Sequence, residues 1–272
     1  MPQVSVIMSV YNAQSEEILR TAIESICSQT FLDFEFIICD DGSTDDTWEK
    51  LQKIAATDSR IQLIHNKENR KAGYARNCCI RQASGNYIAV MDADDISDPR
   101  RLEIEKEYLD EHGECDFVGT RSQFFIKQIG DDEENYWFCK KPVGENFLFS
   151  LPFAHPSCMF RAEALQKVNN YDESKQKIRM EDYDMILRMY EKGLYGENID
   201  QVLYYLRRDE NQYKRRKYRY RWNEAKMKYD GFSKLGLMPK AIPYIIKPLI
   251  VGLIPWRLSA ILQKKYYSRK KL

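Results

Sequence analysis

The sequence lacks several patterns that would assign it to a class directly. Its seven cysteines form no CxxC pair, so we expect neither a disulfide framework nor a zinc site, and a reducing compartment fits better. No GxG occurs, and neither the dinucleotide-binding fingerprint nor a phosphate-binding P-loop is present. The first residues, MPQVSVIMSVYN, have no basic segment and no small-residue cleavage site, so no signal peptide is expected.

The charge is distributed unevenly along the 272 residues, although the formal net charge is only +1. Residues 201–272 contain 19 Lys and Arg against four Asp and Glu, and residues 1–200 carry a net charge of −14. A basic end of this kind indicates an anionic partner, either nucleic acid or a membrane surface. The hydrophobic share of 43% is sufficient for a buried core, so a globular protein is predicted.

The first part of the chain alternates between strand-like and helix-like segments. Apolar runs rich in β-branched residues predict strands at 4–10, 34–39, 61–65 and 87–91. Apolar residues at helical spacing predict helices at 18–26, 44–56, 72–83 and, further along, 181–192. The segment 117–129 could supply one or two further strands. The order predicts an α/β fold with a Rossmann-like, mostly parallel central sheet flanked by helices.

Three clusters of polar residues directly follow predicted strands. They are SVYN at 9–12, DDGSTDD at 40–46 and DADD at 92–95. Because ligands bind beyond the carboxyl ends of the strands in open parallel sheets, these clusters predict a binding site there. DDGSTDD can also be a turn followed by a helix cap, since Gly, Ser, Thr and Asp all favour such positions.

DADD places three carboxylates within four positions, directly after an apolar strand. The helix expected after Pro99 needs a cap, which explains some of this acidity. However, mutual repulsion of the carboxylates raises the energy unless a cation or hydrogen-bond donors compensate it. An Asp-x-Asp pair can hold Mg²⁺ or Mn²⁺ through one or two oxygens while substrate phosphates complete the coordination shell.

Six motifs in this order resemble the inverting glycosyltransferases of family 2, which have the GT-A fold. They are VSVIMSVYN, DDGSTDDT, GYARN, SGNYIAVMDADD, HPSCMFR and MEDYDMILR. The resemblance runs from about residue 4 to residue 207. Within the family, the sequence resembles the bacterial enzymes that build capsule and O-antigen polysaccharides. It implies transfer of a hexose from a nucleotide sugar, most simply a UDP-sugar, to a saccharide acceptor.

The resemblance also implies roles for the residues of the nucleotide-sugar site. Ser9 and Tyr11 would lie against the base, and Asp41 would accept a hydrogen bond from N3–H of uracil or thymine. Arg76 would lie near the nucleotide and Asp92 would contact the ribose. Ser9 stands where the family often has proline, but the contact expected there is mainly through the backbone.

The same resemblance makes Asp94 the ligand of Mn²⁺ or Mg²⁺ and Asp182 the general base. A base is needed because an acceptor hydroxyl is a weak nucleophile, and a single displacement would invert the anomeric configuration. Glu181 and Asp184 would raise the proton affinity of Asp182, although acids at a helix start also simply complement its dipole. His155 either lines an acceptor pocket or is an interior histidine. No clear QxxRW motif is present, which puts a polymerising activity in doubt.

The basic end contains two different patterns. Residues 212–228 interleave cations with aromatic residues, which fits stacking on nucleic acid or a solvated basic helix. Residues 241–256 are apolar but contain Lys247 and three prolines, so we expect them to lie in a membrane interface rather than to span a bilayer. The basic residues at 264–271 would then contact anionic headgroups. This favours a membrane partner over nucleic acid.

Together these patterns predict a glycosyltransferase domain at 1–207 and a basic, amphipathic, helical extension at 208–272. The nucleotide-sugar half would span about 1–98 and the acceptor half about 99–207. We expect a cytoplasmic enzyme, peripheral on the inner face of the membrane, that acts on a polyprenyl-diphosphate-linked saccharide in bacterial surface polysaccharide synthesis. The alternatives are a sugar nucleotidyltransferase, which should show a Gly-rich loop after the first strand, and a non-enzymatic membrane- or RNA-binding module. The oligomeric state is left open.

Overall fold

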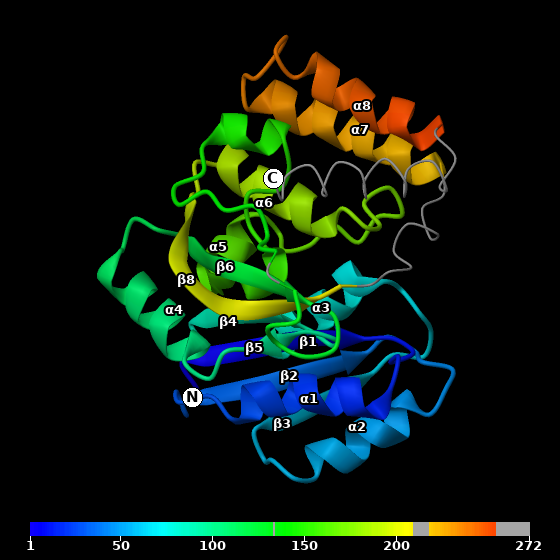
Figure 1. Ribbon diagram of the computed structural model, residues 1–272, viewed down its shortest axis with the longest axis vertical. Coiled ribbons are helices and arrows are strands. Elements are labelled where there is room, and N and C mark those ends of the chain that lie inside the picture. Colours follow the sequence, from blue (N-terminus) through cyan, green and yellow to red (C-terminus); the bar gives the residue numbers. More distant parts are fainter. Residues whose placement is uncertain (133, 209–217, 254–272) are drawn as a thin grey trace.

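The computed structural model describes residues 1–132, 134–208 and 218–253 of the chain. Figure 1 shows a twisted central sheet with helices packed on both of its faces. Within the described residues the strands lie in the order β3-β2-β1-β4-β7-β6-β8-β5. Their bounds are β1 Val4–Val10, β2 Phe34–Asp40, β3 Ile61–His65, β4 Tyr87–Asp92, β5 Ile96–Ser97, β6 Phe117–Phe125, β7 Met159–Arg161 and β8 Gly196–Arg207. The predicted α/β fold is therefore confirmed.

The four strands β3, β2, β1 and β4 are parallel to one another. The residues of β1, β2 and β4 are almost all buried on both faces of the sheet, which explains why the sequence shows continuous apolar runs there rather than alternation. The pairing register places Ser9 of β1 opposite Cys39 of β2 and Asp92 of β4. The three polar clusters predicted from the sequence consequently emerge at one edge of the sheet.

The helices follow the strands in the predicted alternation and cover both faces. Their bounds are α1 Glu16–Cys27, α2 Thr47–Ala55, α3 Ala72–Gln82, α4 Arg101–Glu111, α5 Ala162–Lys167 and α6 Glu181–Glu191, with 3₁₀ turns η1 Gly144–Leu148 and η2 His155–Ser157. One face of the sheet, which includes Met8 of β1, is covered by α1, α2 and α4. The other face, which includes Ile7 of β1, is covered by α3, α5 and α6. The predicted amphipathic helix at 181–192 is thus present as α6.

The second half of the sheet is mixed in direction. Strand β7 pairs antiparallel with β4 and β6, and β8 pairs parallel with β6. The segment 117–129 contributes one strand, β6, which ends at Phe125. This half supports the loops that carry residues 148–151 and the start of α6.

The C-terminal part forms two helices, α7 (Tyr218–Lys234), which packs on α6, and α8 (Ile242–Leu253), which packs on α7. They lie at the end of the molecule opposite β3 and α2 (Figure 1). A Cβ atom on Gly231 would lie 2.8 Å from Cδ1 of Leu187, so the absence of a side chain permits the close approach of α7 to α6. Met227 and Phe232 of α7 are buried in the same apolar cluster as Leu187.

Helix α8 covers most of the apolar segment predicted at 241–256, and residues 254–256 lie outside the described residues. The basic residues at 264–271 also lie outside the described residues. Among the helices that are described, none combines the length and the hydropathy that crossing a membrane requires. The domain boundary near residue 207 remains a prediction, because α7 shares its core with α6.

Candidate functional site

Two cavities meet beside the N-terminus of α6. The first, which we call the sheet-edge cavity, has a volume of about 600 Å³ and is bounded by the segments that follow β1, β2 and β4 and by the start of α3. The second, the helix-lined cavity, has a volume of about 560 Å³ and lies between residues 148–151, α6, α7 and α8. Both volumes fall in the usual range for ligand pockets.

The six residues predicted to bind the nucleotide sugar and its metal all line the sheet-edge cavity. They are Ser9, Tyr11, Asp41, Arg76, Asp92 and Asp94. Asp182, the predicted base, lines the helix-lined cavity instead, whereas its neighbour Glu181 lines the sheet-edge cavity. The structure thus brings the predicted residues to adjoining cavities, with the start of α6 between them.

Asp41 is buried at the base of the sheet-edge cavity and organises the chain around it. Its carboxylate accepts hydrogen bonds from Asn66 Nδ2 at 3.2 Å, from the Arg70 amide at 3.0 Å and from the Lys71 amide at 2.7 Å. Burial raises the pKa of Asp41, and these donors oppose that effect. The residue therefore holds the turn that enters α3, where Lys71 has a φ of 79°.

Arg76 and Asp92 form a largely buried ion pair across the cavity floor. Arg76 Nη2 lies 2.7 Å from Asp92 Oδ1, and α3 and the end of β4 supply the two residues. Among the described residues, Arg76 Nε and Glu181 Oε2 are buried polar atoms without a hydrogen-bond partner. A buried polar atom of this kind is costly unless a ligand or water satisfies it, so the cavity floor offers a donor and an acceptor to a polar ligand.

The DADD segment separates into one buried and two cavity-facing carboxylates. Asp95 is buried and accepts a 2.7 Å hydrogen bond from the Arg207 amide. Burial and the charges of Asp94 and Asp92 raise the pKa of Asp95 well above its usual range. Asp92 and Asp94 line the sheet-edge cavity, so the repulsion expected from the sequence is relieved partly by burying one acid and partly by Arg76.

The donor set at Asp94 fits a hard divalent cation. Within the described part of the chain, no group of three or more His, Cys, Asp and Glu is arranged to hold a metal ion. Mg²⁺ and Mn²⁺ are commonly held by one or two carboxylates together with substrate phosphates and water. Asp94, with Asp92 two residues away, matches that kind of site, and both residues line the sheet-edge cavity.

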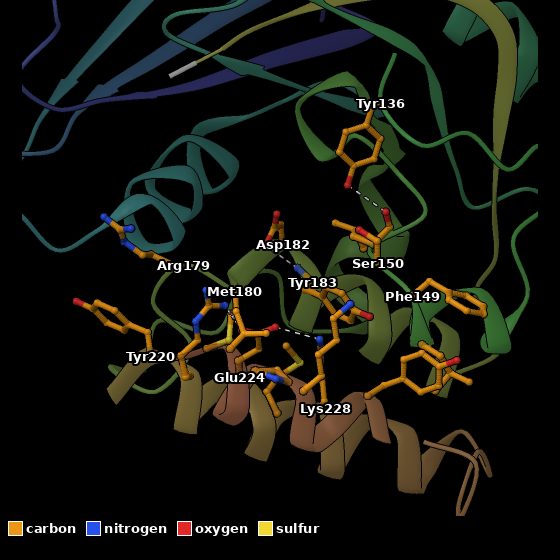
Figure 2. A pocket seen from close by; sticks show the side chains of 18 residues that line it. Tyr136, Phe149, Ser150, Arg179, Met180, Asp182, Tyr183, Tyr220, Glu224 and Lys228 are labelled. Atoms are coloured by element: carbon orange, nitrogen blue, oxygen red, sulfur yellow. Dashed lines mark hydrogen bonds and ion pairs between the residues drawn. The ribbon is translucent and has the colours of Figure 1, made fainter. Parts of the chain in front are cut away.

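Asp182 has the properties of a base. Burial and the neighbouring Glu181 carboxylate raise the pKa of Asp182 to about 6, against the opposing effects of the Tyr183 amide and Arg76. The Tyr183 amide donates a 2.7 Å hydrogen bond to Asp182 Oδ1. Figure 2 shows the Asp182 side chain rising from α6 between Arg179 and Tyr136, into the helix-lined cavity. At neutral pH the group is ionised and more basic than an ordinary aspartate.

Arg179 and Tyr220 line both cavities, and the sequence reasoning did not select either. The Arg179 guanidinium lies 5.7 Å from the centre of the Tyr220 ring, and Arg179 has a φ of 70°. A non-glycine residue with a positive φ is uncommon, and such conformations are concentrated at functional sites. For Tyr220 the only sequence signal is the mixture of cations and aromatic residues at 212–228, which is also typical of nucleic-acid binding or of a solvated helix.

His155 is an interior histidine and lines neither cavity. It is buried, and its Nε2 atom lies 2.8 Å from the Tyr171 hydroxyl. Burial and the charge of Arg76 lower the pKa of His155 well below its usual range, so the ring is neutral. The alternative that His155 lines the acceptor pocket is therefore wrong.

Comparison with known proteins identifies relatives along almost the whole chain. A family model described as Glycosyl transferase family 2 matches residues 5–168, and one described as Glycosyl transferase family group 2 matches residues 87–268. EpsE of Bacillus subtilis (strain 168) is 37% identical over 270 residues, which are 99% of this chain and 94% of EpsE. WfaP of Escherichia coli, named a UDP-Glc:alpha-D-GlcNAc-diphosphoundecaprenol beta-1,3-glucosyltransferase, is 31% identical over 76% of this chain and 78% of its own length.

Solved structures show the same fold at low sequence identity. TarS 1–349 of S. aureus, in complex with UDP-GlcNAc, has a TM-score of 0.72 at 18% identity and covers 90% of this chain and 73% of its own. The mannosyltransferase PcManGT of Pyrobaculum calidifontis, in complex with GDP-Man and Mn²⁺, has a TM-score of 0.63 at 18% identity and covers 98% and 80%. The GT-A fold expected from the sequence is confirmed.

Proposed function

Because the chain belongs to glycosyltransferase family 2, we propose that it transfers a hexose from a UDP-sugar to a saccharide acceptor with inversion at the anomeric carbon. The observation that carries this proposal is the position of the start of α6 between the two cavities. Glu181 faces the sheet-edge cavity and Asp182 faces the helix-lined cavity. A base there lies on the far side of a donor held in the sheet-edge cavity, as a single displacement requires.

The donor nucleotide would occupy the sheet-edge cavity. The uracil ring of the nucleotide stacks on Tyr11, whose side chain is 46% exposed at the cavity rim, and lies against Ser9. The Asp41 carboxylate has about four lone-pair positions, and the Arg70 amide shares its proton between both oxygens, so the N3–H of uracil would take the position of one of these two Arg70 contacts. Asp92 accepts from the ribose, and Arg76 contributes positive charge nearby.

We propose that Asp94 would hold Mn²⁺ or Mg²⁺ when the donor is bound. The ion would supply charge stabilisation for the nucleoside diphosphate as it leaves. The hard oxygen donors at Asp94 and the Mn²⁺ reported in the complex of PcManGT support this assignment.

The transfer itself needs one base. Asp182 removes the proton from the acceptor hydroxyl while the hydroxyl oxygen forms a bond to the anomeric carbon. The bond between the anomeric carbon and the β-phosphate oxygen breaks, and its electron pair leaves with UDP. The raised pKa of Asp182, about 6, makes it a stronger proton acceptor than an ordinary aspartate while leaving it ionised at neutral pH.

The proposed acceptor is a saccharide carried on a polyprenyl diphosphate, as in bacterial surface polysaccharide synthesis. The name of WfaP specifies such an acceptor, GlcNAc-diphosphoundecaprenol, and a UDP-glucose donor.

We propose that α8 attaches the enzyme to the inner face of an anionic membrane. Four aliphatic side chains recur at helical spacing along its outer face and are 43%, 43%, 59% and 72% exposed: Ile242, Ile246, Ile250 and Leu253. A stripe of this kind on a surface helix marks an interaction site. Residues 236–272 contain eight Lys and Arg and no Asp or Glu, so the part of the sequence that includes the stripe is basic and complements anionic headgroups.

A donor and acceptor screen tests the proposed reaction. The full chain is incubated with UDP-, dTDP- and GDP-sugars, Mn²⁺ and a GlcNAc acceptor on a lipid diphosphate, and nucleoside diphosphate release and product configuration are measured. We expect release from a UDP-hexose that depends on Mn²⁺ and on the acceptor, with inversion. A folded protein that binds no nucleotide sugar in the presence of metal would refute the proposal.

Vesicle binding tests the membrane proposal separately. Glutamate at Ile246 should weaken binding to anionic vesicles at least about tenfold, because burying one Ile side chain contributes about 1.5–3 kcal/mol. Leu32 is 71% exposed and precedes β2, a strand that lies toward the other end of the molecule from α8 in Figure 1, so Leu32→Glu is the matched control and should bind as the unchanged protein does. Equal binding of the Ile246→Glu and Leu32→Glu variants would show that the stripe does not contact the membrane.

A further inference from the structure

The C-terminal helices form one wall of the cavity that contains the base. Tyr220, Arg221 and Lys228 of α7 and Tyr244 and Lys247 of α8 line the helix-lined cavity together with Asp182. Figure 2 shows α7 and α8 across the cavity from Asp182, with Glu224 and Lys228 extending from α7 toward the α6 side. These helices follow the segment 5–168 matched by the Glycosyl transferase family 2 model and lie within the segment 87–268 matched by the family group 2 model. They are therefore well placed to determine which acceptor reaches the base.

Positive charge exceeds negative charge in this cavity. Two carboxylates, Asp182 and Glu224, line it together with four cations, so the positive charges exceed the negative charges by two. The cations are Arg179, Arg221, Lys228 and Lys247. Glu224 lies between two of the cations, 3.0 Å from Arg221 Nη1 and 3.0 Å from Lys228 Nζ. Within the described chain Lys247 has no ion pair or hydrogen bond.

Lys247 and Arg221 are the cations best able to bind an anionic ligand. Lys247 is exposed to the cavity and the solvent, and its charge is not compensated by a carboxylate. The Nη1 group of Arg221 donates a hydrogen bond to Glu224. Because a guanidinium has five N–H donors, Arg221 retains further N–H groups that can donate to a ligand. The two side chains come from packed helices, since a Cβ on Gly252 of α8 would lie 2.9 Å from Arg221 Cγ.

The remaining lining suits a saccharide on one side and an apolar chain on the other. Tyr136 and Tyr220 line the cavity together with Asp182, and aromatic faces are suited to packing against sugar rings. Pro248 and Val251 contribute apolar surface from α8, and the Phe149 ring meets the Tyr244 ring edge-on at 5.4 Å. The cavity thus combines a base, aromatic rings, cations and apolar surface.

We propose that the helix-lined cavity selects acceptors in which the saccharide is joined to its carrier through a diphosphate, and that Lys247 and Arg221 bind the diphosphate oxygens. The inference rests on the proposed glycosyl transfer and assigns acceptor specificity to residues of α7 and α8. The saccharide lies toward Asp182, and the carrier leaves over α8. Charge-assisted hydrogen bonds to phosphate oxygens supply the selection.

A pair of acceptors that differ only in the diphosphate tests the inference with the full chain. GlcNAc is attached to the same alkyl chain either through a diphosphate or through a simple ether, and kcat/KM is measured for both with the active nucleotide sugar. The variants are Lys247→Ala, Lys247→Arg and Lys226→Ala. Lys226 is an exposed lysine of α7 that lines neither cavity, so its variant controls for the loss of one positive charge.

The preference for the diphosphate acceptor should fall about tenfold or more in Lys247→Ala, since one charge-assisted hydrogen bond contributes about that factor. Lys247→Arg and Lys226→Ala should keep the preference. UDP affinity is measured for each variant, so that a loss of donor binding is recognised. Equal use of both acceptors by the unchanged protein, or an unchanged preference in Lys247→Ala, overturns the inference while the proposed function stands.

A third acceptor distinguishes the source of the negative charge. It carries a uronic acid on the ether-linked saccharide and has no diphosphate. If Lys247→Ala lowers kcat/KM only for this uronic acid acceptor, the cations bind an acidic sugar and the inference is wrong. Transfer to none of the acceptors, with any nucleotide sugar, would overturn the proposed function together with the inference.

Discussion

Replacing Asp182 by Asn should remove the base without changing the shape of the cavity. General base catalysis typically contributes a factor of about 10²–10⁴, so we expect kcat to fall by at least about a hundredfold. We expect the decrease in kcat to lie toward the upper end of that range, because burial and the Glu181 charge raise the pKa of Asp182 to about 6 and so increase its basicity. The KM for the UDP-sugar should change little, since Asp182 lines the helix-lined cavity.

The pH dependence gives the same prediction a second readout. The carboxylate accepts a proton only when ionised, so kcat/KM at saturating Mn²⁺ should fall about tenfold per pH unit below about 6. An ordinary aspartate would lose activity only near its reference value of about 3.9. Besides Glu181, the charges acting on Asp182 are those of Arg76, which lowers its pKa, and Asp92, which raises it.

Glu181→Gln identifies the titrating group. Removing the Glu181 charge should move the acid limb of the profile toward lower pH, because that charge is the second cause of the raised pKa after burial. UDP release and product configuration are followed from pH 4.5 to 8 in constant ionic strength. The reasoning is refuted if Asp182→Asn keeps more than about a tenth of the activity, or if the acid limb ignores Glu181→Gln.

Three further changes test the sheet-edge cavity, the helix-lined cavity and the loop that follows β2. Asp94→Ala should abolish the Mn²⁺-dependent part of UDP binding, measured by calorimetry with and without metal, and retention of that part would remove Asp94 from the metal site. Tyr220→Ala should lower transfer about tenfold or more, whereas Trp222→Ala, on the same helix but 61% exposed and outside both cavities, should not; equal effects would contradict the role of Tyr220. Gly42→Ala should lower the free energy of unfolding by about 2–4 kcal/mol, because Gly42 has a φ of 68° and a Cβ there would lie 2.5 Å from the Glu68 carbonyl carbon. A thermal melt equal to that of the unchanged protein would show that the loop relaxes without cost.

The donor side of the site could be predicted from sequence because it depends on local order. The alternation of strands and helices implies a parallel sheet, and a parallel sheet aligns the carboxyl ends of its strands. Ser9 and Asp92 are therefore neighbours in register, and the polar residues that follow them face one cavity. Asp41 follows the adjacent strand and is held there by amides of the next loop.

The acceptor side could not be predicted in this way. Nothing in the spacing of 212–228 distinguishes a solvated basic helix from one that packs on α6 and turns Tyr220 and Arg221 toward the base. His155 likewise carried no local signal that it hydrogen-bonds to Tyr171 in the interior. Both outcomes depend on contacts between segments far apart in the chain.

The sequence by itself determined the family, the sheet and the row of polar residues at its edge, because hydrophobic periodicity and strand order act within short segments. Only the tertiary structure decided that Asp182 and Glu181 face different cavities, that Asp182 is buried enough for its pKa to rise to about 6, and that α7 and α8 close the second cavity. The physical reason is that burial, and the electrostatic effects that follow from it, depend on which distant surfaces pack together.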